Sequence, residues 1–303
     1  TALQASERSL AYPATACSRC RRAGSVGAMS DTLREPSPYH DDLRLAHVLA
    51  DSVEEITTSR FGAADLQVES KPDLTPVTEA DREAERVIRE NLKRARPRDA
   101  IKGEEFGTSG KADRLWIIDP IDGTKNYVRG VPVWATLIAL VDAGTPVVGL
   151  VAAPALHRRW WAAQGTGAWT GRSLTSATSI SVSKVDTLAD ASLSYSSFNG
   201  WAERGKDMDL FRLSKECWRS RAYGDFFSHM LVAQGSVDIA PEPELEDYDM
   251  AALVPIVTEA GGRFTGLDGR PGCWSGNGVS TNGLLHDDVL ARLRAGDETE
   301  GGA

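Results

Sequence analysis

Two stretches near the start of the chain have the hydrophobic spacing of amphipathic helices. From His40 to Phe61 apolar residues recur every three or four positions, and Gly62 follows, so the pattern predicts a helix that ends there. A second helix is predicted from about Thr78 to Ala95, and the segment "TEAD" at its start has the spacing of a capping box. The positions expected to face inward are Leu43, Ala46, Leu49, Val53, Ile56, Val87, Ile88 and Leu92.

The middle of the chain has the pattern of β-strands joined by hairpins. Apolar runs are separated by the turn-forming sequences "DAGT" and "QGTG", which predicts an antiparallel sheet. The predicted strands are residues 114–119, 133–141, 146–154 and 158–163.

Beyond about residue 185 predicted strands and helices alternate, which indicates a sheet covered by helices. The predicted strands are residues 191–197, 218–224, 237–240 and 263–267, and the predicted helices are residues 206–217, 225–235, 249–262 and 284–296.

These patterns divide the chain into four segments. Residues 1–36 are predicted to be a disordered extension, because 1–28 lack hydrophobic periodicity and contain a single acidic residue, Glu7. Residues 37–184 are predicted to form an N-terminal α+β subdomain, 185–295 a C-terminal α/β subdomain and 296–303 a frayed tail. The acid-poor leader also fits a transit peptide, but Met29 opens the ordinary-looking chain, so we favour an upstream extension.

Composition and charge narrow the classes of protein. The 303 residues carry a net charge of -9, which argues against a nucleic-acid partner, because phosphate backbones select basic surfaces. We find no run of about eighteen apolar residues, so no membrane span is predicted. The four cysteines, Cys17, Cys20, Cys217 and Cys273, are too few for a disulfide framework, which fits a reducing, cytoplasmic location. We expect no function for the Cys17–Cys20 pair, which has no second pair at zinc spacing.

Candidate chemistry begins at the end of the predicted strand 114–119. Asp119 and Asp122 lie on either side of Pro120, whose ring fixes the local backbone, so both carboxylates can point to one side of a turn. Gly123 and Thr124 follow, and they offer backbone N–H groups and a hydroxyl to an anion. Because Asp, Pro and Gly are common turn residues, a plain turn explains this stretch equally well on its own.

Further acidic residues stand in apolar surroundings elsewhere. Glu104 and Glu105 lie in the loop "IKGEEFG", and Asp249 stands at the head of an apolar helix, where it also fits a capping role. If Glu104, Asp119, Asp122 and Asp249 converge, their mutual repulsion requires a cation. Because all these ligands are hard oxygens, Mg²⁺ is preferred and Mn²⁺ is tolerated. A metal beside an anion-binding turn indicates a protein that handles phosphate.

Three motifs in this order resemble those of the inositol-monophosphatase-like family of Mg²⁺-dependent, lithium-sensitive phosphatases. They are "GEE" at 103–105, "WIIDPIDGT" at 116–124 and "YDMAALVPIVTEAGG" at 248–262; "KPDLTPVTEAD" at 71–81 adds a fourth. The resemblance covers roughly residues 40 to 295. It implies an α/β fold, a five-layer αβαβα sandwich, and a homodimer.

The resemblance also implies roles for single residues. Two or three Mg²⁺ ions would be bound by Glu104, Asp119, Asp122, Asp249 and the carbonyl of Ile121. Gly123 and Thr124 would hold the phosphate of a small phosphate ester. Thr124, with Glu104 or Asp81, would orient and activate a water molecule at the metals, which attacks phosphorus in line. Glu105 is expected to have a supporting role, and Asp81 also fits the capping box.

Within the family, the sequence from Lys125 onward is most similar to the histidinol-phosphate phosphatase branch. The run "GVPVWATLIAL" and the segment "YGDF" carry this similarity. Gly224, Asp225 and Glu242 match substrate positions of the family, and Arg221 is a further candidate for substrate contact. Acidic groups suit histidinol phosphate, which has an ammonium group and an imidazole. Inositol 1-phosphate, fructose 1,6-bisphosphate and a nucleotide 3′-phosphate remain alternative substrates, as does a broad-range phosphatase or a non-catalytic metal-binding protein.

Overall fold

The structure is a computed structural model that describes residues 37–71 and 76–294. The predicted extension (1–36), the predicted tail (296–303) and the Cys17–Cys20 pair lie outside the described residues.

The two predicted N-terminal helices are confirmed. Helix α1 spans His40–Arg60 and α2 spans Glu79–Ala95. The capping box of α2 is formed: the Thr78 side chain accepts from the backbone N–H of Asp81, and the Asp81 carboxylate accepts from the N–H of Thr78 at 2.8 Å. The sequence pattern therefore placed both the position and the start of this helix.

The predicted strands of the middle region belong to an eight-stranded sheet with the order β10-β9-β8-β7-β6-β5-β3-β4. Neighbours from β5 to β10 are antiparallel, as expected for hairpins, but β3 and β5 are parallel. The strands are β3 (Ala100–Gly103), β4 (Gly107–Ser109), β5 (Arg114–Asp122), β6 (Ala135–Asp142), β7 (Thr145–Ala153), β8 (Arg158–Ala163), β9 (Ala168–Gly171) and β10 (Ala177–Ile180).

The alternating second half forms a five-stranded sheet with the order β12-β11-β13-β15-β14. Its strands are β11 (Ser192–Ser194), β12 (Arg219–Arg221), β13 (Ile239–Glu242), β14 (Arg263–Thr265) and β15 (Gly278–Thr281). Its helices are α4 (Phe198–Glu203), α5 (Asp207–Glu216), α6 (Asp225–Ala233), α7 (Asp247–Met250), α8 (Leu253–Glu259) and α9 (His286–Arg294).

Two predictions for this half are corrected. The helix predicted over 249–262 is two helices, α7 and α8, because Pro255 lies in the first turn of α8 and has no N–H to bond back to the preceding turn. Strand β15 was not predicted, since its four residues are enclosed by turn-forming Gly, Asn and Ser. Other short elements were not predicted either: β1 (Val68–Ser70), β2 (Pro76–Thr78), α3 (Thr124–Val128), α4, and the strands β3, β4, β9 and β10 of the first sheet.

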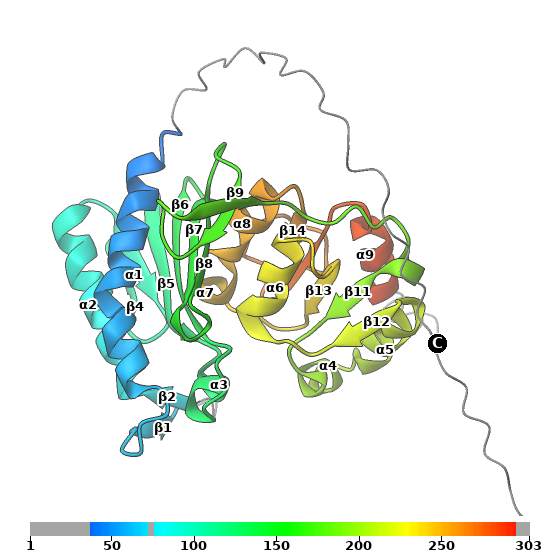
Figure 1. Ribbon diagram of the computed structural model, residues 1–303, viewed down its shortest axis with the longest axis horizontal. Coiled ribbons are helices and arrows are strands. Elements are labelled where there is room, and N and C mark those ends of the chain that lie inside the picture. Colours follow the sequence, from blue (N-terminus) through cyan, green and yellow to red (C-terminus); the bar gives the residue numbers. More distant parts are fainter. Residues whose placement is uncertain (1–36, 72–75, 295–303) are drawn as a thin grey trace, which may run out of the picture. The chain divides into compact units, whose positions relative to one another are not determined.

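The helices and sheets form five layers (Figure 1). Helices α1 and α2 cover one face of the eight-stranded sheet, and α6 and α8 cover the other. Helix α6 also contacts β13 and β15, and α8 contacts β14, so this pair lies between the two sheets. Helices α4, α5 and α9 share a hydrophobic core with the outer face of the second sheet. The expected αβαβα sandwich is therefore confirmed.

The core is rich in tryptophan. Trp116, Trp134, Trp160, Trp161 and Trp201 are all at most 2% exposed, so they fill the layers and line no open cleft. The described residues belong to one compact unit, and the subdomain boundary predicted near residue 185 lies in the link between β10 and β11. In the described part of the chain, none of the helices has the length and apolar character needed to cross a membrane.

Candidate metal centre

Asp119 and Asp122 both lie on β5, which continues three residues past its predicted end. The register of β5 against β6 shifts between them, so three steps along β5 match two along β6. Residues an odd number of positions apart face opposite sides of a regular strand, and this bulge at Pro120 and Ile121 brings both carboxylates to the same side. The carbonyl of Pro120 is held by the hydroxyl of Thr136 at 2.8 Å.

Asp249 joins these two aspartates from the other half of the chain. One carboxylate oxygen from each of Asp119, Asp122 and Asp249 lies within 4.8 Å of the others. Asp249 is also the third residue of α7, where it accepts from the backbone N–H of Glu246 at 2.8 Å. The capping role considered for Asp249 is therefore real, and it orients the carboxylate toward the cluster rather than competing with it.

The cluster carries more negative charge than its surroundings neutralise. Burial, followed by the charges of neighbouring acids, holds the pKa values of Asp119 and Asp122 well above the usual range and raises that of Asp249 to about 7. Among the described residues, we find no lysine or arginine paired with any of the three. Three close, hard carboxylate oxygens without a counter-charge fit a divalent cation of the Mg²⁺ or Mn²⁺ type.

Glu104 lies beside this cluster but outside the group of three. Its backbone N–H donates to the carbonyl of Ile118, next to Asp119, at 3.2 Å, and its charge raises the pKa of Asp119 and Asp249. One of its oxygens pairs with Lys71 at 2.6 Å, and Lys71 also pairs with Glu105 at 2.7 Å. Although burial lowers the pKa of Lys71, its bonds to Glu104 and Glu105 raise it above the usual range. Lys71 is thus a charge at the site that sequence reasoning did not single out.

The turn that carries Glu104 and Glu105 is supported from beneath by Glu85 of α2. The fully buried Glu85 carboxylate accepts from the backbone N–H of Glu105 at 2.6 Å and pairs with Arg89 at 2.6 Å. A side chain at Gly103 would meet this carboxylate at 2.1 Å, which explains the glycine of the "GEE" motif. Sequence reasoning missed Glu85, although its position one turn after Asp81 on a helix places it on the same face.

Asp81 and Thr124 lie at the same end of β5. The pKa of Asp81 is raised to about 7, chiefly by burial, and its Oδ1 atom is buried without a hydrogen-bond partner in the described structure. The Thr124 hydroxyl donates to the carbonyl of Ile121 at 3.0 Å, so two of the predicted site groups contact each other. Gly123 has a positive φ of 81° and begins α3; a side chain there would meet the carbonyl of Val133 at 2.9 Å.

A second set of acids adjoins the metal cluster. Asp225 begins α6, and the next backbone N–H, that of Phe226, donates to Asp122 at 3.0 Å. Ser196 links Asp225 to Glu242: its hydroxyl accepts from the N–H of Asp225 at 2.6 Å and donates to Glu242 at 2.8 Å. Asn126 donates to the Asp225 carboxylate at 2.9 Å. We call Asp225 and Glu242 the acid pair, and Ser196 and Asn126 its donors.

Burial dominates the electrostatics of the acid pair. It raises the pKa of Asp225 to about 6 and that of Glu242 to about 8. Gly224, which has a φ of 88°, precedes α6, and its backbone N–H donates to the hydroxyl of Ser228 at 3.1 Å. Ser196 and Asn126 were missed at the sequence level, because their partners lie far along the chain and no local spacing marks them.

Arg221 is the one predicted site residue that the structure does not bring to the carboxylates. Its side chain is exposed on β12 and donates to the carbonyl of its neighbour Ser220 at 2.7 Å. Its proposed contact with substrate therefore stays a prediction.

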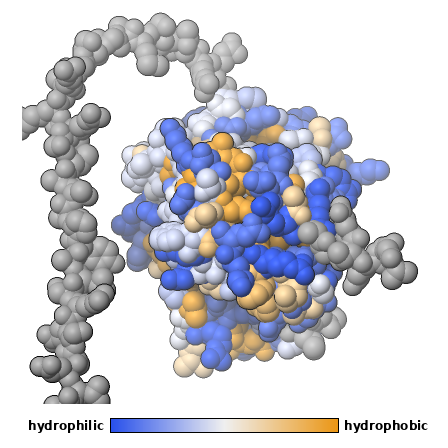
Figure 2. Space-filling view, turned by 90° about the vertical axis from the view of Figure 1, so that its right-hand side faces the viewer, coloured by the Kyte–Doolittle hydropathy of each residue, from blue (hydrophilic) through white to orange (hydrophobic). Residues whose placement is uncertain are grey.

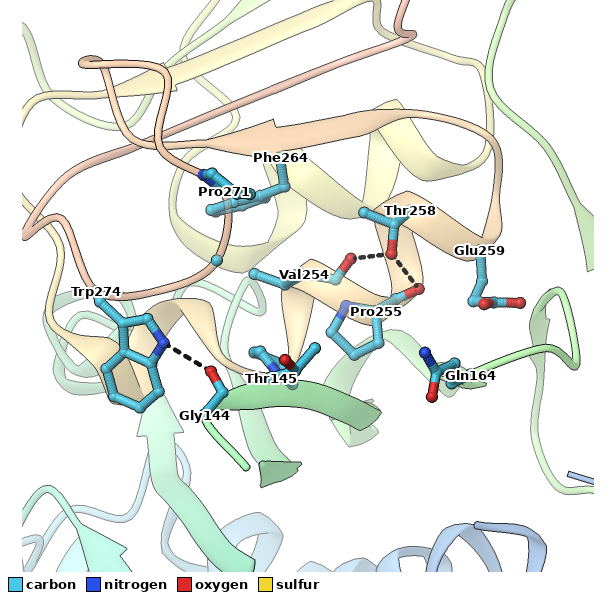
Figure 3. Close-up of a pocket in the computed structure, with 12 residues that line it drawn as sticks. Gly144, Thr145, Gln164, Val254, Pro255, Thr258, Glu259, Phe264, Pro271 and Trp274 are labelled. Atoms are coloured by element: carbon cyan, nitrogen blue, oxygen red, sulfur yellow. Dashed lines mark hydrogen bonds between the residues drawn. The ribbon is translucent and has the colours of Figure 1, made fainter. Parts of the chain in front are cut away.

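A separate cavity of about 330 Å³ lies away from all of these residues (Figure 3). It is formed by the turn between β6 and β7, by α8 and by the segment around Trp274, whose indole N–H donates to the carbonyl of Gly144 at 3.0 Å. The hydroxyl of Thr258 donates to the backbone of its own helix. Since these polar groups are already bonded, the cavity offers no convergent chemistry, and the carboxylates remain the candidate site.

Comparisons with known proteins show the family to which this chain belongs. A histidinol-phosphatase of Streptomyces coelicolor is 63% identical over 84% of this chain and 97% of its own length. A histidinol-phosphatase of Mycobacterium tuberculosis is 57% identical over 85% of this chain and 99% of its own length. A solved structure of an inositol monophosphatase from Zymomonas mobilis superimposes with a TM-score of 0.76 at 34% identity, over 86% of this chain and 100% of that one. The model of the inositol monophosphatase family matches residues 40–297. The chain therefore belongs to the inositol monophosphatase family.

Proposed function

We propose that this protein hydrolyses L-histidinol phosphate to L-histidinol and inorganic phosphate in histidine biosynthesis. As a member of its family, the chain is a phosphomonoester hydrolase. The observation that supports the substrate is the acid pair, Asp225 and Glu242, beside the aspartate cluster: a phosphate ester with a cationic end matches both in one molecule. The two relatives named as histidinol-phosphatases support the same substrate.

The metal ligands of this proposal are Asp119, Asp122 and Asp249, with Glu104 and the carbonyl of Ile121 as further ligands. We propose Mg²⁺, in two or three ions, with Mn²⁺ as a substitute, because every donor is an oxygen. When bound, the metal supplies Lewis-acid stabilisation of the negative charge on the phosphate and on the leaving oxygen.

The chain's own groups orient the reacting atoms. The N–H groups at Gly123 and Thr124, at the start of α3, face the phosphate in this proposal. Asp81 has an unpartnered buried oxygen and a pKa near 7, and with Glu104 it accepts the proton of the attacking water. The water oxygen bonds to phosphorus, the bond from phosphorus to the histidinol oxygen breaks, and that oxygen takes up a proton.

The acid pair contacts the other end of the substrate. The carboxylates of Asp225 and Glu242 face the ammonium and imidazole groups, while Gly224 leaves room at the backbone. Arg221 contributes from the rim of the site in this proposal. Inositol 1-phosphate is the second candidate, because its hydroxyl groups also donate hydrogen bonds to buried carboxylates.

A panel of phosphate esters tests the proposal. Phosphate release is measured with histidinol phosphate, inositol 1-phosphate, fructose 1,6-bisphosphate and a nucleotide 3′-phosphate, each with Mg²⁺ and with a chelator. We expect the highest kcat/KM for histidinol phosphate and no release with chelator. Activity that survives the chelator contradicts the metal mechanism, and a preference for inositol phosphate contradicts the substrate. Comparable values across the panel indicate a broad-range enzyme.

We also propose a homodimer in the cytoplasm. Trp218 is 67% exposed beside β12, an edge strand of the second sheet, and Phe211 of α5 is 46% exposed. Figure 2 shows the side of the molecule where α5 and α9 lie, which is mainly hydrophilic with separate apolar patches. Sedimentation of the wild type and of W218E tests this: the wild type is expected to sediment as a dimer, and W218E to shift toward the monomer.

The free thiols of Cys217 and Cys273 support the proposed location, because they fit a reducing compartment such as the cytoplasm.

A further inference from the structure

The metal cluster is assembled from two distant parts of the chain, which must be held together against their own charge. Asp119 and Asp122 come from β5, whereas Asp249 comes from α7. Like charges at these separations repel, most strongly where they are buried. Something other than the three carboxylates must therefore fix α7 against β5.

An ion pair spans this junction close to the ligands. Lys102 of β3 and Asp247 of α7 are joined at 2.6 Å between Nζ and Oδ2. Lys102 lies two residues before Glu104, and Asp247 lies two residues before Asp249. Lys102 is also held in register with Ile117 of β5 through the parallel pairing of β3 and β5. The Lys102–Asp247 ion pair thus connects β3, and through it β5 with Asp119 and Asp122, to helix α7, which carries Asp249.

The surroundings of this pair differ from those of an ordinary surface ion pair. Only 13% of the Asp247 side chain and 31% of the Lys102 side chain are exposed. The second carboxylate oxygen of Asp247 is buried without a hydrogen-bond partner in the described structure. Exposed pairs contribute little because water screens them, but a partly dehydrated pair is costly to break at one end.

We propose that Lys102 and Asp247 are positioning residues that hold α7 against the first sheet, so that Asp249 meets Asp119 and Asp122 at the metal. This inference rests on the metal-dependent function proposed above. Neither side chain is assigned to the metal or to the substrate. Removing either end leaves the fold but lets α7 move away under the repulsion between carboxylates, and metal binding weakens.

The test measures metal binding directly, without substrate. Mn²⁺ and Mg²⁺ are titrated calorimetrically into the wild type, K102M, D247N and the double variant, with thermal unfolding as a check on folding. We expect K102M and D247N each to raise the metal Kd about tenfold, in the range for groups that support metal ligands. The double variant is expected to bind no more weakly than either single variant, because all three lack the same pair. K102R is expected to stay within about threefold of the wild type, since it restores the charge.

The matched control is R96M, which removes an ion pair of similar exposure, Arg96 with Asp42 at 2.9 Å, between the end of α2 and the start of α1. It is expected to leave the metal Kd unchanged. If folded K102M and D247N bind metal as the wild type does, or if their effects add in the double variant, the positioning role is wrong. If the wild type itself binds no divalent metal, the proposed function fails instead, so the two failures are distinguishable.

Discussion

The two neighbouring groups of acids in this molecule are both buried, but they receive different partners. Asp119, Asp122 and Asp249 accept backbone N–H groups and have no cation among the described residues. Asp225 and Glu242 are instead bonded to the neutral side chains of Asn126 and Ser196. The three aspartates therefore concentrate negative charge at one point. Asp225 and Glu242 are instead held in place by hydrogen bonds to Asn126 and Ser196.

This difference separates the two tasks of the site. A cluster whose carboxylates repel one another has a strong reason to bind a small, doubly charged ion. A pair held by neutral donors keeps its shape without a ligand, and it suits a larger organic cation whose position must be defined. In the proposed function, the reaction type therefore depends on Asp119, Asp122 and Asp249, and the substrate preference depends on Asp225 and Glu242. A substitution in one group is then expected to change one property without the other.

The largest effect is expected from D119N. This change removes a ligand charge, so kcat/KM should fall by about a thousandfold, as expected when several kcal/mol of metal stabilisation are lost. The same change reduces repulsion in the metal-free protein, which should become more stable by about 1 kcal/mol. Phosphate release with Mg²⁺ and thermal unfolding with chelator measure the two effects. An active D119N would show that Asp119 is not an essential metal ligand. A metal-free D119N that is clearly less stable than the wild type would show that the three carboxylates do not repel one another strongly.

The next effect is a pH dependence of stability. Because burial raises the pKa of Glu242 from 4.5 to about 8, the folded metal-free protein holds a proton that the unfolded chain releases. The contribution of Glu242, on the order of 5 kcal/mol, is fully present below about pH 4.5 and is lost progressively as pH rises through 8. Urea unfolding of the wild type and E242Q from pH 5 to 8 measures it.

E242Q should show a flatter pH profile than the wild type. Saturating Mg²⁺ should remove the share of the pH dependence that comes from the metal cluster and leave the share of Glu242. Parallel profiles for the two proteins would mean that Glu242 is not the titrating group.

The smallest effect is expected from S196A, which removes the hydroxyl between Asp225 and Glu242. A hydrogen bond to a charged group is worth about 1.5 kcal/mol, so KM for histidinol phosphate should rise about tenfold. The metal Kd and kcat should change little, because no metal ligand is touched. S52A is a suitable control, since Ser52 bonds only within α1 and to Asn91. An equal change in metal affinity would mean that the two acid groups are not independent.

Local signals in the sequence predicted much of the fold. The capping box at Thr78, the spacing of apolar residues in α1 and the turn sequences between β6 and β7 and between β8 and β9 all lie within a few residues of the element they define. The break between α7 and α8 was also visible as Pro255, but the apolar run around it resembled one continuous helix.

The acids of the site could be selected from the sequence because they lie in motifs with fixed spacing. The structure adds that Asp119, Asp122 and Asp249 come together in space. The bonds from Glu85 to Glu105, from Ser196 to Glu242 and from Asn126 to Asp225 join residues far apart in the chain. Glu85, Ser196 and Asn126 are ordinary polar residues in sequence terms, and only the packing of α2, the loop after β11 and α3 brings them to the acids. The supporting shell of the site therefore could not be predicted.

The division of the metal cluster between β5 and α7 has a consequence for how the protein is made. A ribosome releases Asp119 and Asp122 long before Asp249, and between them comes most of the second sheet. Until α7 has emerged and docked, the nascent chain carries two aspartates and an unfinished ion site. In the proposed function, metal binding is then a late event of biosynthesis, because it follows the assembly of the two sheets.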